Sequence, residues 1–165
     1  MPDAIINEAG KLLKPDKPLV FISYSHEDRR FFDELRKQLI VLERKTSFSF
    51  WDDTQIVASE KWKQKINDSL NKAKIAILLI SPSFFSSNFI YDVEFKPLIE
   101  KAMENDVRIL WVYVDHVDYI GFGIGEFQAV TLPKKGLKPL SGMRPADRNA
   151  LYVKVIETIK AILGC

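Results

Sequence analysis

A carboxylate that directly follows a buried strand is the feature of this sequence best suited to chemistry. The apolar run at residues 75–80 predicts a buried strand, and the serines that follow it can begin a helix. Glu94 then falls early in that helix, beyond the carboxyl end of the strand, where open α/β sheets place their ligands. A carboxylate in such a place can stabilise developing positive charge and accept hydrogen bonds from hydroxyl groups. Glu94 is therefore the catalytic candidate.

Other residues near the predicted strand ends each allow a functional and a purely structural interpretation. Ser81 and Ser83 could hold phosphate oxygens or simply cap the helix. Trp62 could form a pocket wall or pack in the core. Asp52 could extend into a cleft from the second strand or cap its own loop. His26 could act as a base, although a lone histidine in a turn is more often a cap or a surface residue.

The elements that must position these residues alternate between strands and helices. Short apolar or alternating runs predict strands at residues 19–24, 47–51, 75–80 and 107–114, with a short fifth strand near 128–132. Amphipathic spacing predicts helices over residues 28–43, 62–73 and 147–163, and another carrying Glu94. This alternation favours a flavodoxin-like, three-layer α/β fold. Its central parallel sheet would have four to five strands in the order 2-1-3-4-5, with helices on both faces.

Length, charge and cysteine content narrow the class of protein. The chain has 165 residues, 47% of them hydrophobic, which suits one domain with a proper core. A net charge of +2 with interspersed signs argues against nucleic-acid binding. The single cysteine favours a reducing compartment, and the sequence shows no secretory signal and no apolar run of ~20 residues. We expect a cytoplasmic protein without a membrane partner.

Three motifs occur in order along the chain: Phe21-Ile-Ser-Tyr-Ser-His-Glu-Asp28, Phe50-Trp-Asp-Asp53, and the segment from Leu78 to Glu94. Together they resemble the motifs of Toll/interleukin receptor (TIR) domains of the bacterial type. The first is similar to the family's opening motif, and the second to its second strand with the BB loop. Leu78-Leu-Ile-Ser-Pro-Ser-Phe-Phe-Ser-Ser-Asn-Phe-Ile-Tyr-Asp-Val-Glu94 resembles the third strand and the segment that carries the family's catalytic glutamate. Two departures are Phe89-Ile90, where many members have Trp-Cys, and a BB loop without glycine or proline at its tip.

The resemblance covers residues 17–163, after a short polar leader at residues 1–16. The abrupt end after an amphipathic helix suits the N-terminal part of a longer protein. The resemblance implies an enzyme that cleaves the nicotinamide–ribose bond of NAD⁺ as a substrate, with no other cofactor and no metal. Water would give ADP-ribose and internal attack a cyclic product, and either NAD⁺ or NADP⁺ could serve. Glu94 would be catalytic, and the substrate-binding residues would be Phe21, Ser23, Tyr24, Ser25, Asp52, Trp62, Ser81, Ser83 and Phe89.

The resemblance further implies partners and a setting. TIR domains commonly stack head to tail, so we expect self-association to activate the enzyme. A fused sensor domain and a role in bacterial anti-phage defence would fit. The alternative is a non-catalytic TIR–TIR interaction module. Two weaker alternatives are a response-regulator receiver, disfavoured because strand three ends in Ser81 rather than an aspartate, and a nucleoside deoxyribosyltransferase.

Overall fold

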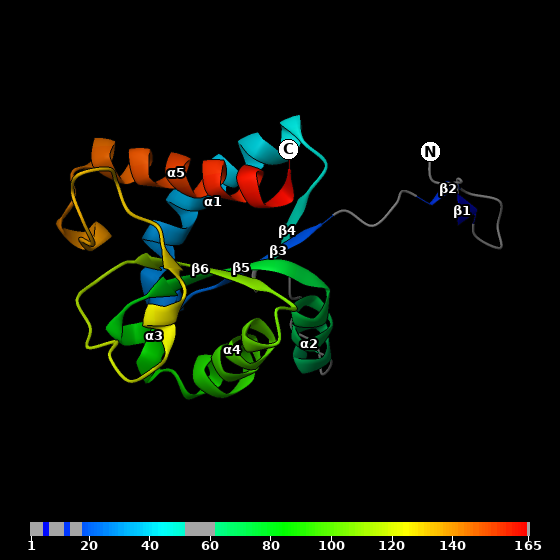
Figure 1. Ribbon diagram of the computed structural model, residues 1–165, viewed down its shortest axis with the longest axis horizontal. Coiled ribbons are helices and arrows are strands. Elements are labelled where there is room, and N and C mark those ends of the chain that lie inside the picture. The colour runs from blue at the N-terminus through cyan, green and yellow to red at the C-terminus, as the bar shows by residue number, and fades with distance from the viewer. Residues whose placement is uncertain (1–4, 7–11, 14–17, 52–61, 165) are drawn as a thin grey trace.

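A parallel sheet forms the centre of the molecule (Figure 1). The computed structural model describes residues 5–6, 12–13, 18–51 and 62–164. The strands of the sheet are β3 (Leu19–Ser23), β4 (Ser49–Trp51), β5 (Ala73–Ile80), β6 (Arg108–Tyr113) and β7 (Gln128–Ala129). Their spatial order is β4-β3-β5-β6-β7, and all neighbouring pairs are parallel. The predicted order 2-1-3-4-5 is therefore confirmed, including the short fifth strand.

Helices cover both faces of this sheet, which completes the predicted three layers. In Figure 1, α1 (Arg29–Lys45) and α5 (Pro145–Leu163) lie together on one face. The opposite face carries α2 (Trp62–Lys72), α3 (Pro82–Ser86) and α4 (Lys96–Met103). The α1 and α5 helices match the helices that amphipathic spacing predicts at 28–43 and 147–163.

The central strand β5 divides the core because its side chains alternate between the two faces of the sheet. Ile75, Ile77 and Leu79 pack with the buried side chains of α1 and α5. Ala76, Leu78 and Ile80 pack with those of α2, α3 and α4. All six side chains are fully buried. A strand buried on both faces reads as an unbroken apolar run, which is why residues 75–80 are so clear in the sequence.

The segment after β5 differs from the single helix expected there. The α3 helix ends at Ser86, and a π-helix, η3 (Ile90–Phe95), then leads into α4. The backbone N–H of Lys96 accordingly bonds to the carbonyl of Tyr91, five residues earlier. Pro97 has no N–H to continue the ladder and its ring crowds the preceding turn. We attribute the wider turn to this proline. Glu94 therefore lies in a π-helix, a form frequent at functional sites.

Two short strands also lie in the segment predicted as a leader. They are β1 (Ile5–Ile6) and β2 (Leu12–Leu13), and they pair with each other in antiparallel fashion. In the part of the chain described, no helix is long and apolar enough to cross a membrane.

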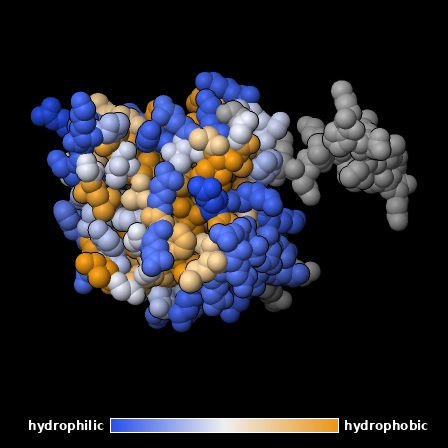
Figure 2. All heavy atoms as spheres, viewed as in Figure 1, coloured by the Kyte–Doolittle hydropathy of each residue, from blue (hydrophilic) through white to orange (hydrophobic). Residues whose placement is uncertain are grey.

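On the face shown in Figure 2, hydrophilic residues dominate the surface over α2, whereas hydrophobic residues gather in the middle of the face.

Candidate functional site

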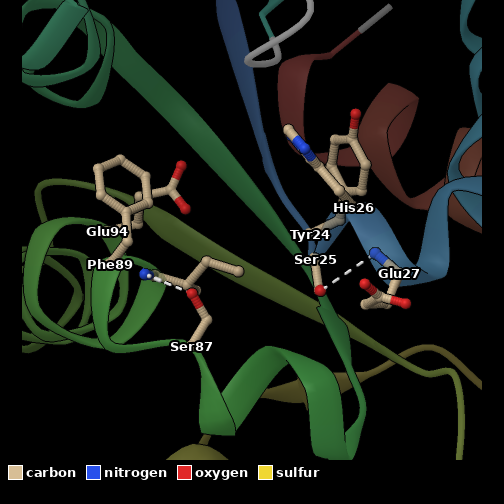
Figure 3. A pocket seen from close by; sticks show the side chains of 8 residues that line it. Tyr24, Ser25, His26, Glu27, Ser87, Phe89 and Glu94 are labelled. Carbon is tan, nitrogen blue, oxygen red and sulfur yellow. Dashed lines mark hydrogen bonds between the residues drawn. The ribbon is translucent and has the colours of Figure 1, made fainter.

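A pocket of about 310 Å³ opens at the carboxyl edge of the sheet. Two segments far apart in sequence form it, and Figure 3 shows them facing each other across the cavity. One is the end of β3 with the short helix η1 (His26–Asp28); the other is the stretch from Ser87 to Glu94. The lining residues are Tyr24, Ser25, His26, Glu27, Ser87, Phe89, Ile90 and Glu94. The pocket lies where the chain leaves the carboxyl ends of β3 and β5, which is the position at which open α/β folds bind ligands.

Glu94 is the most unusual residue of this pocket because it is an acidic side chain that is only 4% exposed. It contributes to the pocket lining from η3. Its Oε2 accepts a hydrogen bond of 3.0 Å from Ser23 Oγ, a serine that is itself completely buried at the end of β3. A carboxylate is seldom buried to this degree without partners, since removing it from water is costly. The arrangement therefore ties the acidic group to the sheet.

The opposite wall is built by the turn that follows β3. Ser25 caps η1, because its Oγ accepts a hydrogen bond of 3.3 Å from the backbone N–H of Glu27. Tyr24 is buried and stacks on Phe32 of α1, with ring centroids 4.0 Å apart. His26 and Glu27 are exposed at the edge of the pocket. This wall is thus anchored to α1 through an aromatic stack and shaped locally by a serine cap.

The wall formed by the stretch from Ser87 to Glu94 contains a second serine cap. Ser87 Oγ accepts a hydrogen bond of 3.2 Å from the backbone N–H of Ile90, at the start of the π-helix. Phe89 remains 36% exposed beside it, so a large apolar ring stands at the mouth of the pocket. The lining therefore combines a buried carboxylate with aromatic and hydroxyl groups. Such a lining can hold a flat, polar ligand and place one charge against it.

A second buried polar contact links η1 to the residue that directly follows β5. Ser81 Oγ donates a hydrogen bond of 2.5 Å to Asp28 Oδ2 and accepts one of 3.0 Å from the backbone N–H of Phe84. Burial raises the pKa of Asp28 above its usual value of 3.8; the hydrogen bond from Ser81 opposes this rise, and the nearby charges of Asp115 and Glu27 add to it. Ser81 therefore both caps α3 and donates a hydrogen bond to a buried carboxyl group.

Five of the residues considered from the sequence come together at this pocket. They are Tyr24, Ser25, His26, Phe89 and Glu94. Ser23 lies directly behind them, in contact with Glu94 rather than with the cavity. The structure thus unites the opening motif and the glutamate segment, although these are about seventy positions apart.

The other proposed residues lie elsewhere or outside the described part of the chain. Phe21 is completely buried and stacks on Trp51, with ring centroids 5.1 Å apart. Ser81 and Ser83 do not line the pocket; Ser83 lies half-buried on α3. Trp62 is the first residue of α2, but its side chain is outside the described residues. Asp52 also lies outside them.

Three pocket residues were not selected from the sequence: Glu27, Ser87 and Ile90. Glu27 is a common surface type, and nothing in its spacing separates it from other polar residues. A serine shortly before an apolar run can cap a helix, so Ser87, which shortly precedes Phe89 and Ile90, could have been placed at a helix start. Among the described residues, no group of three or more His, Cys, Asp or Glu side chains could hold a metal ion.

Comparison with known families agrees with this geometry. The family model described as TIR domain matches residues 20–140, most of the chain and all of the pocket. The chain belongs to the TIR domain family. It is 32% identical over 147 residues to the uncharacterised protein y4lF of Sinorhizobium fredii. That alignment covers 89% of this chain and 44% of the relative. The chain therefore spans less than half the length of this bacterial relative.

A solved TIR domain shares the fold at low sequence identity. The TIR domain of the Toll-related receptor TRR-2 from Hydra magnipapillata superposes with a TM-score of 0.55 at 17% identity. That match covers 87% of this TIR chain and 96% of the receptor domain. The TIR domains of the activated Roq1 resistosome, which recognises the pathogen effector XopQ, match with a TM-score of 0.48 at 24% identity, over 61% of this chain and 59% of that one.

Proposed function

We propose that this TIR domain cleaves the bond between nicotinamide and ribose in NAD⁺, with Glu94 as the catalytic residue. The observation that supports this most directly is a carboxylate, 4% exposed, on the wall of a pocket at the carboxyl edge of the sheet. Membership of the TIR family supplies the reaction class, because some TIR domains are NAD⁺-consuming enzymes. Without that membership, the same pocket would suggest only a polar ligand.

The chemistry needs little more than this carboxylate. The ring nitrogen of the nicotinamide group in NAD⁺ is already cationic. Nicotinamide therefore leaves as a neutral molecule, with the electron pair of the broken bond on its nitrogen. Positive charge then develops on the ribose. Glu94 stabilises that charge and can accept hydrogen bonds from the ribose hydroxyls. Attack of water at the same carbon, with loss of one proton, gives ADP-ribose, whereas attack by a group of the substrate itself gives a cyclic product.

The remaining lining residues have roles that suit this substrate. Phe89, at the mouth of the pocket, can stack on the nicotinamide ring. Tyr24 and Ser25 face it from the opposite wall and can contact the ribose. The carboxylates of Glu27 and Glu94 both favour the cationic end of the dinucleotide. NADP⁺ carries the same nicotinamide riboside group, so it is a second possible substrate.

The size of the pocket bears on assembly. Ligand pockets typically occupy about 300–1,000 Å³, so a cavity of about 310 Å³ is at the small end and suits one half of a dinucleotide. We propose that a second copy covers the other half, which would make activity dependent on self-association. A head-to-tail contact of this kind can propagate along a filament. A fused sensor and a role in anti-phage defence are consistent with such control.

The test is an NAD⁺-consumption assay on the purified chain at high concentration with a crowding agent. Glu94→Gln keeps the shape of the side chain but removes its charge. Glu100→Gln is the matched control, because Glu100 is an exposed glutamate of α4. We expect nicotinamide release by wild type and Glu100→Gln, and a loss of at least about 10²-fold in Glu94→Gln.

The outcomes separate the two candidate functions. NAD⁺ loss that is unchanged in Glu94→Gln would show that Glu94 is not catalytic. No loss by any variant, even when the chain is forced to oligomerise by fusion, would instead support a TIR interaction module. Chromatography of the product distinguishes ADP-ribose from its cyclic form. Replacing NAD⁺ by NADP⁺ in the same assay measures substrate preference.

A further inference from the structure

The contact between Ser23 and Glu94 joins a completely buried hydroxyl to the acidic group of the pocket. Ser23 is the last residue of β3, and its backbone is held in the sheet beside Leu78 of β5. Its Oγ lies 3.0 Å from Glu94 Oε2. Ser23 has no exposed surface and is not among the pocket-lining residues. Ser23 therefore reaches the pocket only through the carboxylate of Glu94.

We propose that Ser23 is a positioning residue, which holds the Glu94 carboxylate ionised and correctly oriented. This inference rests on the proposed function and assigns Ser23 a role different from the substrate contact expected from the sequence. A hydroxyl that donates to a carboxylate favours its charged form. The hydroxyl is also carried by a strand of the central sheet, in which Ser23 itself pairs with Leu78 of β5.

This support matters because Glu94 is carried by a less regular element. The π-helix η3 has a wider turn than an α-helix, and a glutamate has three rotatable side-chain bonds. A catalytic group must be held within about 0.5 Å of its productive position. The sheet, through Ser23, supplies a hydrogen-bond donor to the carboxylate from an element other than its own. Positioning by a buried partner accounts for why a hydroxyl occupies an otherwise apolar strand end.

Several titratable groups lie around the same pocket, and the test must leave them unchanged. Tyr24, His26 and Glu27 face the same pocket from the opposite wall. On its own helical segment, Asp92 and Lys96 form an ion pair with a distance of 3.6 Å between Oδ1 and Nζ. A change at Ser23 leaves all of these groups in place. The difference between wild type and a Ser23 variant therefore isolates the effect of the hydroxyl.

The first experiment measures the titration of Glu94 directly. Glutamate labelled with ¹³C at the side-chain carboxyl is incorporated, and the Glu94 signal is assigned by its absence from Glu94→Gln. The samples are wild type, Ser23→Ala, Ser23→Thr and Ser69→Ala, the last removing another buried serine hydroxyl, on α2 and away from the pocket. We expect Glu94 to titrate about one pH unit higher in Ser23→Ala than in wild type. Ser23→Thr should titrate closer to wild type, and Ser69→Ala as wild type does.

The second experiment measures NAD⁺ cleavage by the same four proteins at a pH at least two units above every midpoint. Glu94 is then ionised in all of them, so any remaining difference reports orientation. We expect kcat of Ser23→Ala to fall about tenfold with KM nearly unchanged, and Ser23→Thr to recover part of the loss. Thermal unfolding of each variant shows whether it is folded, and Ser23→Thr keeps the comparison informative if Ser23→Ala is not.

Two results would overturn the inference. Equal titration midpoints in wild type and Ser23→Ala would mean that the hydroxyl does not stabilise the ionised carboxylate. A raised KM with an unchanged kcat would mean that Ser23 acts in substrate binding. The titration does not depend on activity, so it still decides the first point if no NAD⁺ is cleaved. Failure of the proposed function would appear separately, as cleavage that persists in Glu94→Gln.

Discussion

Asp28 and Ser81, which are 53 positions apart in the sequence, form a buried hydrogen bond of 2.5 Å. Asp28 immediately precedes α1, and Ser81 immediately precedes α3. The bond therefore fixes the starts of two helices on opposite faces of the sheet relative to each other. The contact between Ser23 and Glu94 is a second buried hydrogen bond between a serine and a carboxyl group in this part of the molecule.

Replacing Ser81 should destabilise the fold. Ser81→Ala removes the cap of α3 and leaves Asp28 without this hydrogen-bond donor. Loss of a helix cap typically costs about 1 kcal/mol, and an unsatisfied buried acceptor about 1–3 kcal/mol. We expect the free energy of unfolding to fall by about 2–3 kcal/mol in urea denaturation. Ser83→Ala, which removes a half-buried serine of the same helix, is the control and should change stability by less than about 0.5 kcal/mol.

Asp28 should make stability depend on pH. Because burial raises its pKa above 3.8 in the folded chain, the folded state binds this proton more tightly than the unfolded state. Its contribution therefore favours folding below pH 3.8 and is lost as the pH rises through the folded pKa. Asp28→Asn keeps an oxygen that can accept from Ser81 and cannot ionise.

The measurement for Asp28 is the free energy of unfolding of wild type and Asp28→Asn at several pH values from 3 to 7. Subtracting the two curves removes the contributions of all other groups. We expect the variant to gain stability relative to wild type as the pH rises. A difference that stays constant with pH, or that changes in the opposite direction, would contradict the raised pKa.

Phe89 should affect substrate affinity more than the chemical step. Phe89→Ala removes the ring at the mouth of the pocket, and stacking of an aromatic side chain on a base contributes about 1–3 kcal/mol. We expect KM for NAD⁺ to rise about tenfold, with a smaller change in kcat. Met103→Ala is the matched control, because Met103 is also a large exposed apolar residue but does not line the pocket. An equal effect of both variants would argue against a specific role for Phe89.

The contact between α1 and α5 should contribute to stability through one ion pair. Arg148 Nε lies 3.1 Å from Glu34 Oε1, and Arg148 also donates to the carbonyl of Met143 at 2.9 Å. Both side chains are largely buried, with exposures of 15% and 24%. A double-mutant cycle with Glu34→Gln and Arg148→Met should give a coupling energy of about 1–2 kcal/mol. The exposed pair Lys154 and Glu157 should give less than about 0.5 kcal/mol.

The sequence alone was sufficient for the architecture because the relevant signals are local. The run from Ile75 to Ile80 is apolar at every position, and this is typical of a strand buried on both faces. The spacing of Phe31, Leu35 and Leu39 predicts a helix with one buried face. Alternation of these patterns then leaves few ways to arrange a parallel sheet. The flavodoxin-like strand order 2-1-3-4-5 followed from that alternation.

The site could be predicted only in part, since contacts between distant segments are not encoded in spacing. The sequence singled out Glu94, Tyr24, Ser25 and Phe89, because each lies next to a strand end or within a motif. It did not predict that Pro97 would accompany a π-helix at Glu94, or that Ser87 would cap it. Those features depend on how the chain satisfies its backbone hydrogen bonds after the strand.

The tertiary structure alone decided what Ser23 and Ser81 do. In the sequence both are serines at strand ends, equally suited to contact a ligand. Folding buries both of them and directs their hydroxyls to carboxylates from remote segments, Glu94 and Asp28. A buried carboxylate needs a hydrogen-bond partner, and which hydroxyl provides it depends on which strands and helices meet. Residue types thus determined which groups could do chemistry, and packing determined which of them face the pocket and which support it.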